Sequence, residues 1–360
     1  MKIVIRVDAS IEIGIGHIMR CLTLADALLK QAAEVSFICR VHEGNLIQYI
    51  KNKGYVVYSL ALSLSEENLL PYNDGNPLAH QHWLGTTQYN DAKVCEPILE
   101  ELCPDWLLVD HYALDYHWQN QLKDKYKKLM VIDDLADRKH ECDLLLDQTF
   151  GRKKYSYKEL VPHSCELLLG SQYALLRPEF SQWREYSLQR RIAPELKNIL
   201  VSMGGVDQNN VTSQILQILK TCDLPEELTI TIVLGISSPN IEIVKQIAVT
   251  MPNTTEVKVD VDNMAELMAN ADVSIGAAGA TTWERCCLGV PSILIVLADN
   301  QKIIAQHIAE NNIGVVLKVN QLNTLCDSLV YVKNHLKNFS LNSAEVINGK
   351  GTSHTIGSII

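Results

Sequence analysis

Residues 2 to 29 read KIVIRVDASIEIGIGHIMRCLTLADALL, and three patterns follow one another along this stretch. Residues 2–7 alternate and are rich in β-branched side chains, which is typical of a strand, whereas residues 8–16 predict a glycine loop. From residue 17 the apolar side chains recur at helical spacing. The stretch therefore predicts a strand, a loop and a helix, the repeating unit of a doubly wound parallel sheet.

The loop ends in Gly14, Gly16 and His17, so the histidine stands at the start of the predicted helix. The positive end of a helix disfavours a protonated imidazole, so His17 is expected to be uncharged and available as a base at neutral pH. The alternative is that His17 only caps or fills the turn. Backbone N–H groups around Gly14 and Gly16 are expected to face a ligand at the carboxyl edge of the sheet.

Composition limits the possible partners and compartments. The 360 residues predict two domains, and 47% hydrophobic residues suffice for two cores. The net charge of −10 argues against nucleic acid or an anionic membrane as partner. No apolar run approaches the roughly 20 residues that span a bilayer, and the first residues do not read as a signal peptide, so a soluble, cytoplasmic protein is expected. The ten cysteines lack C-x-x-C spacing, and most are expected to be reduced core residues.

The order of the patterns predicts two similar α/β halves. Buried strands are expected from residue 35 to residue 170, a long polar segment at 63–97 is expected to form a loop or flap, and a second series of strands and helices begins at residue 198. The fold class is therefore α/β, with two Rossmann-like doubly wound domains that face each other across a cleft. The expected bounds are 1–180 for the first domain, 181–196 for a linker, 197–338 for the second domain and 339–360 for a C-terminal tail.

Polar side chains follow two of the expected strands in the first domain. Asp110, His111 and Tyr112 end the strand that begins at Trp106, and the carboxyl ends of parallel strands share one rim, so these residues are expected on the same rim as His17. The pair Asp133 and Asp134 ends the next strand. A metal pair is one interpretation of these carboxylates, and turn-forming carboxylates are the preferred one.

The second half carries two glycine-containing turns. Gly204 and Gly205 follow a predicted strand and offer an anion nest. The small residues at 276–281 follow another strand and open a helix, a pattern that suits a pyrophosphate, and Glu284 one turn later is suited to ribose hydroxyls. The alternative is a helix that needs small residues for close packing. A dinucleotide site at the first loop is disfavoured, because Met19 stands where the third glycine is required.

These motifs resemble the UDP-sugar hydrolases of pseudaminic acid biosynthesis, which are similar in fold to the GT-B glycosyltransferases. The matching segments occur in the same order and cover most of the chain. They are residues 6–8, 14–22, 82–85, 110–112, 133–134, 173–180, 203–207 and 279–284.

The resemblance implies hydrolysis of UDP-2,4-diacetamido-2,4,6-trideoxy-β-L-altropyranose to the free sugar and UDP, with inversion at the anomeric carbon. It implies that His17 is the general base. The residues implied to orient the sugar or the water are Asp8, Arg20, Tyr112 and Asn300, and those implied to hold UDP are Gly204, Gly205, Gly279, Ala280, Thr281 and Glu284. No metal or other cofactor is implied.

Two other functions fit the same patterns. The first is a GT-B glycosyltransferase, which requires an acceptor and usually has a membrane-facing apolar patch on its first domain, although no such basic and apolar helix is evident near the chain start. The second is a non-catalytic sensor that binds a nucleotide sugar without turnover and tolerates loss of His17.

Overall fold

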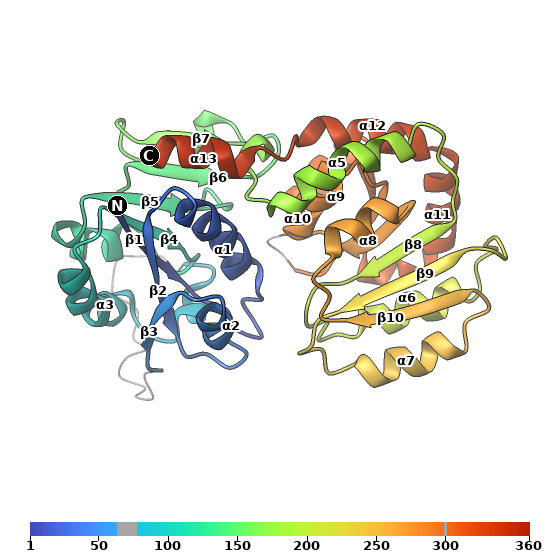
Figure 1. Cartoon of the computed structure of the whole chain (residues 1–360), viewed down its shortest axis with the longest axis horizontal. Helices are drawn as coiled ribbons and strands as arrows, with labels where there is room; N and C mark the ends of the chain where they lie inside the picture. The colour runs from blue at the N-terminus through green and yellow to red at the C-terminus, as the bar shows by residue number, and fades with distance from the viewer. Residues whose placement is uncertain (63–77, 299–300) are drawn as a thin grey trace. The chain divides into compact units, whose positions relative to one another are not determined.

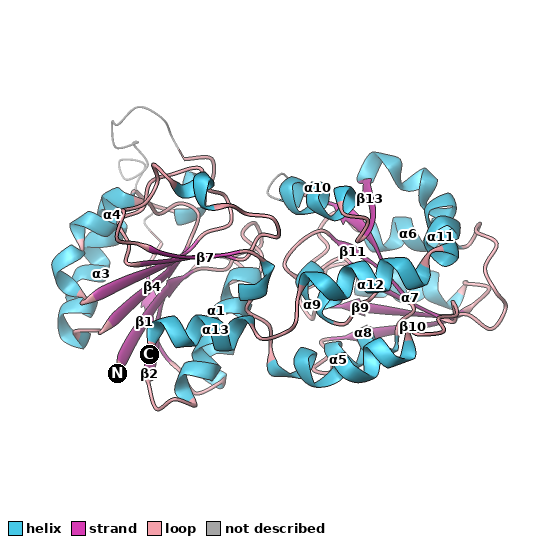
Figure 2. Ribbon diagram, turned by 90° about the horizontal axis from the view of Figure 1, so that it is seen from above, coloured by secondary structure: helices cyan, strands magenta, loops and turns pink. Residues whose placement is uncertain are grey.

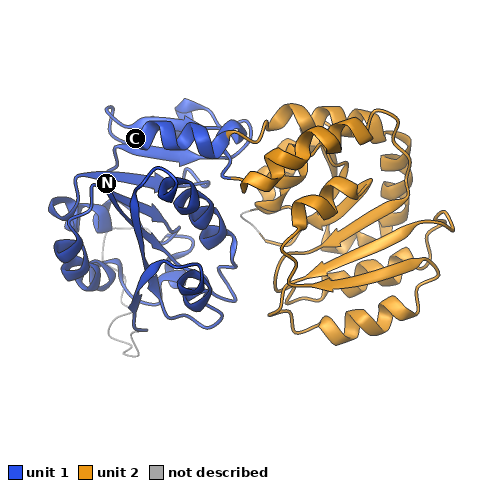
Figure 3. Ribbon diagram, viewed as in Figure 1, with its two compact units in different colours: residues 1–175, 351–360 blue, residues 176–350 orange. Residues whose placement is uncertain are grey.

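The computed structural model describes residues 1–62, 78–298 and 301–360. These residues form two compact units, one of residues 1–175 with 351–360 and the other of residues 176–350 (Figure 3). The bounds differ from those expected from the sequence. The expected linker is mostly helix α5 (Pro178–Arg190) of the second unit, and the expected tail contributes to helix α12 (Leu336–Val346) of the second unit and to α13 (Gly351–Ile359) of the first.

The first unit is a parallel sheet of seven strands with helices on both faces (Figures 1 and 2). The spatial order is β3-β2-β1-β4-β5-β6-β7. The strands are β1 (Lys2–Val7), β2 (Glu34–Arg40), β3 (Val56–Leu60), β4 (Trp106–Asp110), β5 (Lys128–Ile132), β6 (Leu144–Asp147) and β7 (Glu166–Leu169). Helices α1 (Gly16–Leu29) and α13 lie on one face, and α3 (Gln88–Leu102) and α4 (Tyr116–Gln121) lie on the other (Figure 2). The short α2 (Ile47–Asn52) precedes β3.

Strand β1 shows why both faces of this sheet are apolar. Ile3, Ile5 and Val7 belong to the core that includes buried residues of α1, and Val4 belongs to the opposite core, which includes residues of α3. A strand covered by helices on both faces must place apolar side chains on both. Arg6 is the exception, because it carries a charge and yet is fully buried on the α3 side.

The buried charge of Arg6 is balanced by two carboxylates. Its Nη1 lies 2.6 Å from Asp8 Oδ1, and its Nη2 lies 2.8 Å from Asp91 Oδ2 on α3. Asp91 also accepts hydrogen bonds from Arg40 Nη2 at 2.6 Å and from Trp118 Nε1 at 2.9 Å. Burial opposes ionisation of Asp91, but the charges of Arg6 and Arg40 hold the pKa of its carboxyl below its usual range.

Replacement of Asp91 by alanine is expected to destabilise the first unit by about 3–5 kcal/mol, because it removes one partner from each of two buried guanidinium groups. Urea unfolding measures this loss. The matched control on the same helix is Glu96→Ala, because Glu96 forms a partly exposed pair with Lys125 at 2.9 Å. That change is expected to cost less than about 1 kcal/mol. Equal losses in the two variants would contradict the assignment of Asp91 as a buried charge partner.

The second unit repeats the architecture with six parallel strands in the order β10-β9-β8-β11-β12-β13 (Figure 1). The strands are β8 (Asn198–Ser202), β9 (Thr229–Leu234), β10 (Thr254–Val259), β11 (Val273–Ala277), β12 (Ser292–Val296) and β13 (Gly314–Lys318). The helices besides α5 and α12 are α6 (Val211–Leu219), α7 (Ile241–Val249), α8 (Met264–Asn270), α9 (Thr281–Cys287), α10 (Lys302–Glu310) and α11 (Leu325–Asn334). None of the helices in the described ranges has the length and apolarity needed to cross a membrane.

Each sheet has one point where the order of its strands reverses. In the first unit this point lies between β1 and β4, where Val7 pairs with Asp110, and in the second it lies between β8 and β11, where Ser202 pairs with Gly276. Ligands of open parallel sheets bind outside the carboxyl ends of the strands at such points. The loops after these four strands are therefore the places to look for a site.

One sequence-based expectation about local structure was wrong. The polar segment 63–97 is not a loop throughout, because α3 begins at Gln88 after an N-cap at Thr87, whose side chain accepts from Asn90 N. Eight cysteines are free and most of these are buried, as expected, whereas Cys222 and Cys326 form a disulfide across 104 residues of sequence. A pairing over that distance has no signal in local spacing.

Candidate active site

His17 lies at the start of α1, directly after the loop that follows β1. The loop is closed by local hydrogen bonds: Gly14 N donates to Ser10 O at 2.9 Å, and Ser10 Oγ accepts from Ile13 N at 2.9 Å. Gly14 has φ +77°, a conformation that favours glycine. The backbone N–H of Gly14 is therefore used within the loop. It does not face a ligand, contrary to the prediction from the sequence.

The imidazole of His17 is held by a carboxylate from the neighbouring strand. Nδ1 lies 2.6 Å from Oδ1 of Asp110, whose side chain is 1% exposed. Arg20, one turn further along α1, donates to both oxygens of the same carboxylate, from Nε to Oδ2 at 2.6 Å and from Nη2 to Oδ1 at 2.7 Å. Burial opposes ionisation of Asp110, but the charge of Arg20 and the hydrogen bonds from Arg20 and His17 hold its pKa below its usual range.

This arrangement fixes the tautomer of His17. An ionised carboxylate can only accept hydrogen bonds, so Nδ1 of His17 must carry the proton that faces Asp110. In the uncharged ring, Nε2 then keeps its lone pair, and no hydrogen bond from this atom to a described residue is present. A histidine whose Nδ1–H is oriented by a carboxylate, with Nε2 unprotonated, is the arrangement of a general base.

An aromatic wall stands beside this ring. The Tyr112 ring meets the His17 ring edge to face at a centroid distance of 4.6 Å, and the Trp83 ring stacks on Tyr112 at 5.8 Å. His80 packs on Trp83 at 4.2 Å. The Tyr112 hydroxyl donates to Asp134 Oδ2 at 2.9 Å, and Asp134 also accepts from Arg20. Burial and the nearby carboxylates raise the pKa of Tyr112, so its hydroxyl stays protonated and acts as a donor.

Asp8 lines the same small hollow as His17. This hollow is formed by Asp8, Ile13, His17, Trp83, Asp110, His111 and Tyr112. Oδ1 of Asp8 accepts from Arg6 Nη1 and from Arg40 N at 2.7 Å, whereas Oδ2 has no hydrogen bond among the described residues and lies 3.2 Å from His111 Nε2. Burial opposes ionisation of Asp8, but Arg6 and His111 hold its pKa well below its usual range.

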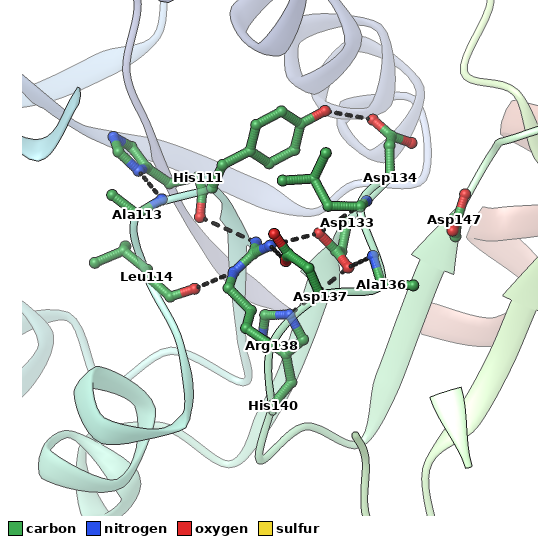
Figure 4. A network of polar contacts seen from close by, with 12 residues as sticks. His111, Ala113, Leu114, Asp133, Asp134, Ala136, Asp137, Arg138, His140 and Asp147 are labelled. Atoms are coloured by element: carbon green, nitrogen blue, oxygen red, sulfur yellow. Dashed lines mark hydrogen bonds and ion pairs between the residues drawn. The ribbon is translucent and has the colours of Figure 1, made fainter. Parts of the chain in front are cut away.

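The two aspartates after β5 have separate partners (Figure 4). Asp133 accepts from Arg138 Nη1 at 2.9 Å and from the backbone N–H of Ala136 at 3.0 Å, so it closes a turn, as the preferred interpretation of the sequence expected. Asp134 instead faces Tyr112 and Arg20. Both carboxylates are thus engaged by donors of this unit.

The second unit presents unused backbone donors at its own switch point. Gly204, with φ +97°, and Gly205 follow β8, and Gly279 and Ala280 follow β11. Their four N–H groups form no hydrogen bond with any residue in the described part of the chain. Free N–H groups at the carboxyl ends of adjacent strands suit an anion such as a phosphate.

Glu284 lies one turn into α9 and is partly buried. Burial raises the pKa of its carboxyl to about 7, against the opposing effect of Arg177 and Arg285. Thr281, the first residue of α9, accepts a hydrogen bond at Oγ1 from Arg285 at 3.2 Å. The acceptor oxygens of Glu284 remain suited to ribose hydroxyls.

The structure gathers the predicted site residues into two groups. His17, Asp8, Arg20 and Tyr112 come together in the first unit. The second group occupies the loops after β8 and β11 and the first turn of α9, and consists of Gly204, Gly205, Gly279, Ala280, Thr281 and Glu284. Asn300 lies outside the described residues.

Sequence reasoning placed Asp110 on the right rim but did not assign it as the partner of His17. The missing information was that β4 lies directly beside β1, with Val7 opposite Asp110. A buried strand that ends in Asp-His-Tyr was the available signal. The sequence offered His80, His82 and Trp83 as side chains that could line a cleft, with a surface flap as the preferred interpretation. It gave no sign that Tyr112 is the partner of His80 and Trp83, because that contact depends on how the segment before α3 folds back.

Comparison with known proteins finds similar sequences. Residues 198–352 match the glycosyltransferase family 28 C-terminal domain. The chain is also 29% identical over 319 residues to a Campylobacter jejuni protein, UDP-2,4-diacetamido-2,4,6-trideoxy-beta-L-altropyranose hydrolase, and the match covers 88% of this chain and 100% of that protein. The resemblance to the UDP-sugar hydrolases is confirmed.

Solved structures establish the fold of this chain. Acinetobacter baumannii MurG superposes with a TM-score of 0.69 at 15% identity, covering 99% of both chains. UDP-GlcNAc 2-epimerase from Neisseria meningitidis, bound to UDP-GlcNAc, gives a TM-score of 0.62 at 11% identity over 100% of this chain and 99% of that one. The predicted GT-B fold, with two parallel α/β domains, is therefore confirmed.

Proposed function

We propose that the protein hydrolyses UDP-2,4-diacetamido-2,4,6-trideoxy-β-L-altropyranose to the free sugar and UDP, with inversion at the anomeric carbon, in pseudaminic acid biosynthesis. The full-length similarity to the Campylobacter jejuni hydrolase supports the substrate. The observation that carries the proposal is the bond between His17 Nδ1 and Asp110, which leaves Nε2 as the basic atom.

In the proposed reaction, His17 Nε2 takes a proton from water while the water oxygen attacks the anomeric carbon. The bond from that carbon to the UDP oxygen breaks, and the electron pair leaves with UDP. UDP is already a good leaving group, so the reaction needs donors for the growing charge on the β-phosphate more than a strong acid. The backbone N–H groups of Gly204, Gly205, Gly279 and Ala280 are the proposed donors.

The other implied residues take roles that fit their contacts. Asp8 lines the hollow beside His17 and its carboxylate is held ionised, so we assign it to orienting the sugar or the water. Arg20 is bound to Asp110 and Asp134, and we assign it to holding the carboxylate that orients His17. The Tyr112 ring is the proposed wall beside the sugar, and Asn300 keeps its proposed role as a ligand of the sugar or the water.

No metal takes part in the proposed reaction. The aspartates that a metal would need after β5 are engaged by Arg138, Arg20 and Tyr112. Incubation with a chelator is therefore expected to leave the rate unchanged, and a loss that Mg²⁺ restores would contradict this part of the proposal.

Glu284 gives a prediction about pH. Its pKa is raised to about 7 by burial, so below pH 7 the carboxyl must lose a proton before it binds ribose as a carboxylate. The charged groups acting on it are Arg177, Arg285 and Glu179. Uridine affinity, measured by calorimetry, is expected to rise up to about tenfold per pH unit below pH 7 and to level off above it. In Glu284→Gln the profile should be flat, whereas an equal slope in both proteins would exclude Glu284.

The decisive assay needs no acceptor. The protein is incubated with a small panel of UDP-diacetamido sugars in water, free UDP is measured, and the configuration of the released sugar is followed by NMR. UDP release with an inverted anomeric centre is the expected result. A retained anomeric configuration would exclude direct attack by water activated at His17.

A glycosyltransferase is the second candidate, because residues 198–352 match a glycosyltransferase domain and the fold is that of MurG. It predicts no UDP release until an acceptor is added. A sensor predicts UDP-sugar binding without turnover in either condition. The acceptor-free assay thus separates the hydrolase from the other two functions, and the same assay with an acceptor added separates the transferase from the sensor.

A further inference from the structure

Arg285 is a fully buried cation in the second unit. It lies on α9 with 1% of its surface exposed, and no carboxylate in the described part of the chain comes within ion-pair distance of it. Arginine is almost never fully buried without a partner of opposite charge, because removing its charge from water is costly. Burial correspondingly lowers the pKa of Arg285 to about 10, which still leaves it protonated at neutral pH.

Only one end of this guanidinium is satisfied. Nη2 donates to the carbonyl of Ala277 and to the hydroxyls of Thr281 and Thr282, at 3.2 Å and 3.3 Å. Nε has no partner, and Nη1 makes no hydrogen bond with any residue the structure describes. Three of the five N–H donors of Arg285 are therefore unused at a site from which water is largely excluded.

The guanidinium lies at the switch point of the second sheet. A Cβ atom on Gly276 would stand 1.9 Å from Arg285 Nη1 and 2.8 Å from the carbonyl oxygen of Ser202, so the Arg285 side chain occupies the space that glycine leaves at the ends of β11 and β8. The loops that follow these two strands carry the unused N–H groups of Gly204, Gly205, Gly279 and Ala280. A buried positive charge and the free backbone donors thus lie at the same edge of the sheet.

We propose that Arg285 supplies the buried positive charge that balances the diphosphate of the nucleotide, and so makes this site selective for a nucleoside diphosphate over the nucleoside. The inference rests on the proposed function, since it needs UDP in these loops. It goes further by assigning the diphosphate preference to one side chain. Glu284 is suited to the ribose and would oppose a phosphate, so it cannot serve this purpose.

The test compares UDP with uridine, which share the base and ribose but differ in charge. Calorimetry on the wild-type protein, Arg285→Met and Arg285→Lys gives the ratio of the two affinities. In Arg285→Met the UDP affinity is expected to fall about ten- to a hundredfold, as for loss of a charge-assisted contact, with uridine affinity changed less than about twofold. Arg285→Lys keeps the charge and should keep most of the preference for UDP.

Arg191→Met is the matched control. Arg191 is also buried in this unit and donates to backbone carbonyls, those of Met268, Ala269 and Ala271, which lie just before β11 begins. It therefore lies at the opposite end of the strand from Arg285. Loss of Arg191 is expected to lower the melting temperature without changing the ratio of UDP to uridine affinity.

The outcomes separate the inference from the function on which it rests. Failure of the wild-type protein to bind UDP would overturn both. If the wild type binds UDP and Arg285→Met loses affinity for UDP and uridine in the same proportion, Arg285 only supports the loop and the inference alone fails. If Arg285→Met does not fold, Arg285→Gln takes its place, because it also removes the charge. A larger loss of affinity for UDP than for uridine in Arg285→Gln supports the inference, and an unchanged ratio of the two affinities overturns it.

Discussion

Replacement of His17 by alanine is expected to reduce kcat by about 10²–10⁴-fold, the usual contribution of a positioned general base. The reason is the geometry of the ring, because Nδ1 is bound to Asp110 and Nε2 is the atom left to accept a proton from water. UDP affinity is expected to change less than about twofold, since the proposed nucleotide ligands all belong to the second unit. Acceptor-free UDP release and calorimetry with UDP measure the two effects separately.

The control for this experiment is the replacement of a histidine that does not contact Asp110. His82 is suitable, because it is exposed and its Nε2 lies 2.7 Å from the equally exposed Glu12. His82→Ala is expected to retain the wild-type rate. Turnover by His17→Ala within threefold of the wild type would show that another group accepts the proton. A wild-type protein that binds the UDP-sugar but turns it over neither with nor without an acceptor would be a sensor.

The strands of both units could be predicted from the sequence, because a strand that is buried on both faces consists almost entirely of apolar residues. Leu107, Leu108 and Val109 are all buried, and the run around them predicted β4. The glycine turns could be predicted for a different reason. Gly204 adopts φ +97°, a backbone conformation that few other residues tolerate. Local backbone demands of these kinds leave a direct mark on the sequence.

Contacts between segments that are distant in the chain could not be predicted from local sequence patterns. The last helix, α13, packs with the first unit, where Trp106 Nε1 donates to Ile359 O at 3.2 Å, although the sequence suggested a tail. The partner of His17 depends on which strand lies beside β1, and that order is a property of the whole sheet. Arg285 lies in a segment with an ordinary helical pattern, and only the fold shows that no carboxylate among the described residues pairs with it.

Replacement of Asp110 by asparagine is the second change with a large expected effect. The Asp110 carboxylate accepts from His17 Nδ1 and Arg20 Nη2 at one oxygen and from Arg20 Nε at the other. Asparagine has the same shape but only one acceptor oxygen, so its NH₂ group must face a donor wherever it is placed. If the NH₂ group faces His17, Nδ1 becomes the acceptor, Nε2 carries the proton, and the base is lost.

We expect kcat of Asp110→Asn to fall about 10²–10⁴-fold, the size expected for loss of the general base. NMR of the imidazole nitrogens checks the cause, because it distinguishes a proton on Nδ1 from one on Nε2. A wild-type tautomer together with a wild-type rate would contradict the role of Asp110.

Asp134→Asn separates this effect from a loss of stability. Asp134 also binds Arg20, and it accepts from the Tyr112 hydroxyl at 2.9 Å, but it makes no hydrogen bond with His17. Both substitutions therefore remove one negative charge from Arg20 and are expected to lower the free energy of unfolding by similar amounts. Only Asp110→Asn changes the group that fixes the proton on His17, so a much larger loss of kcat in that variant than in Asp134→Asn isolates the orientation of the base from the support of the surrounding ion pairs.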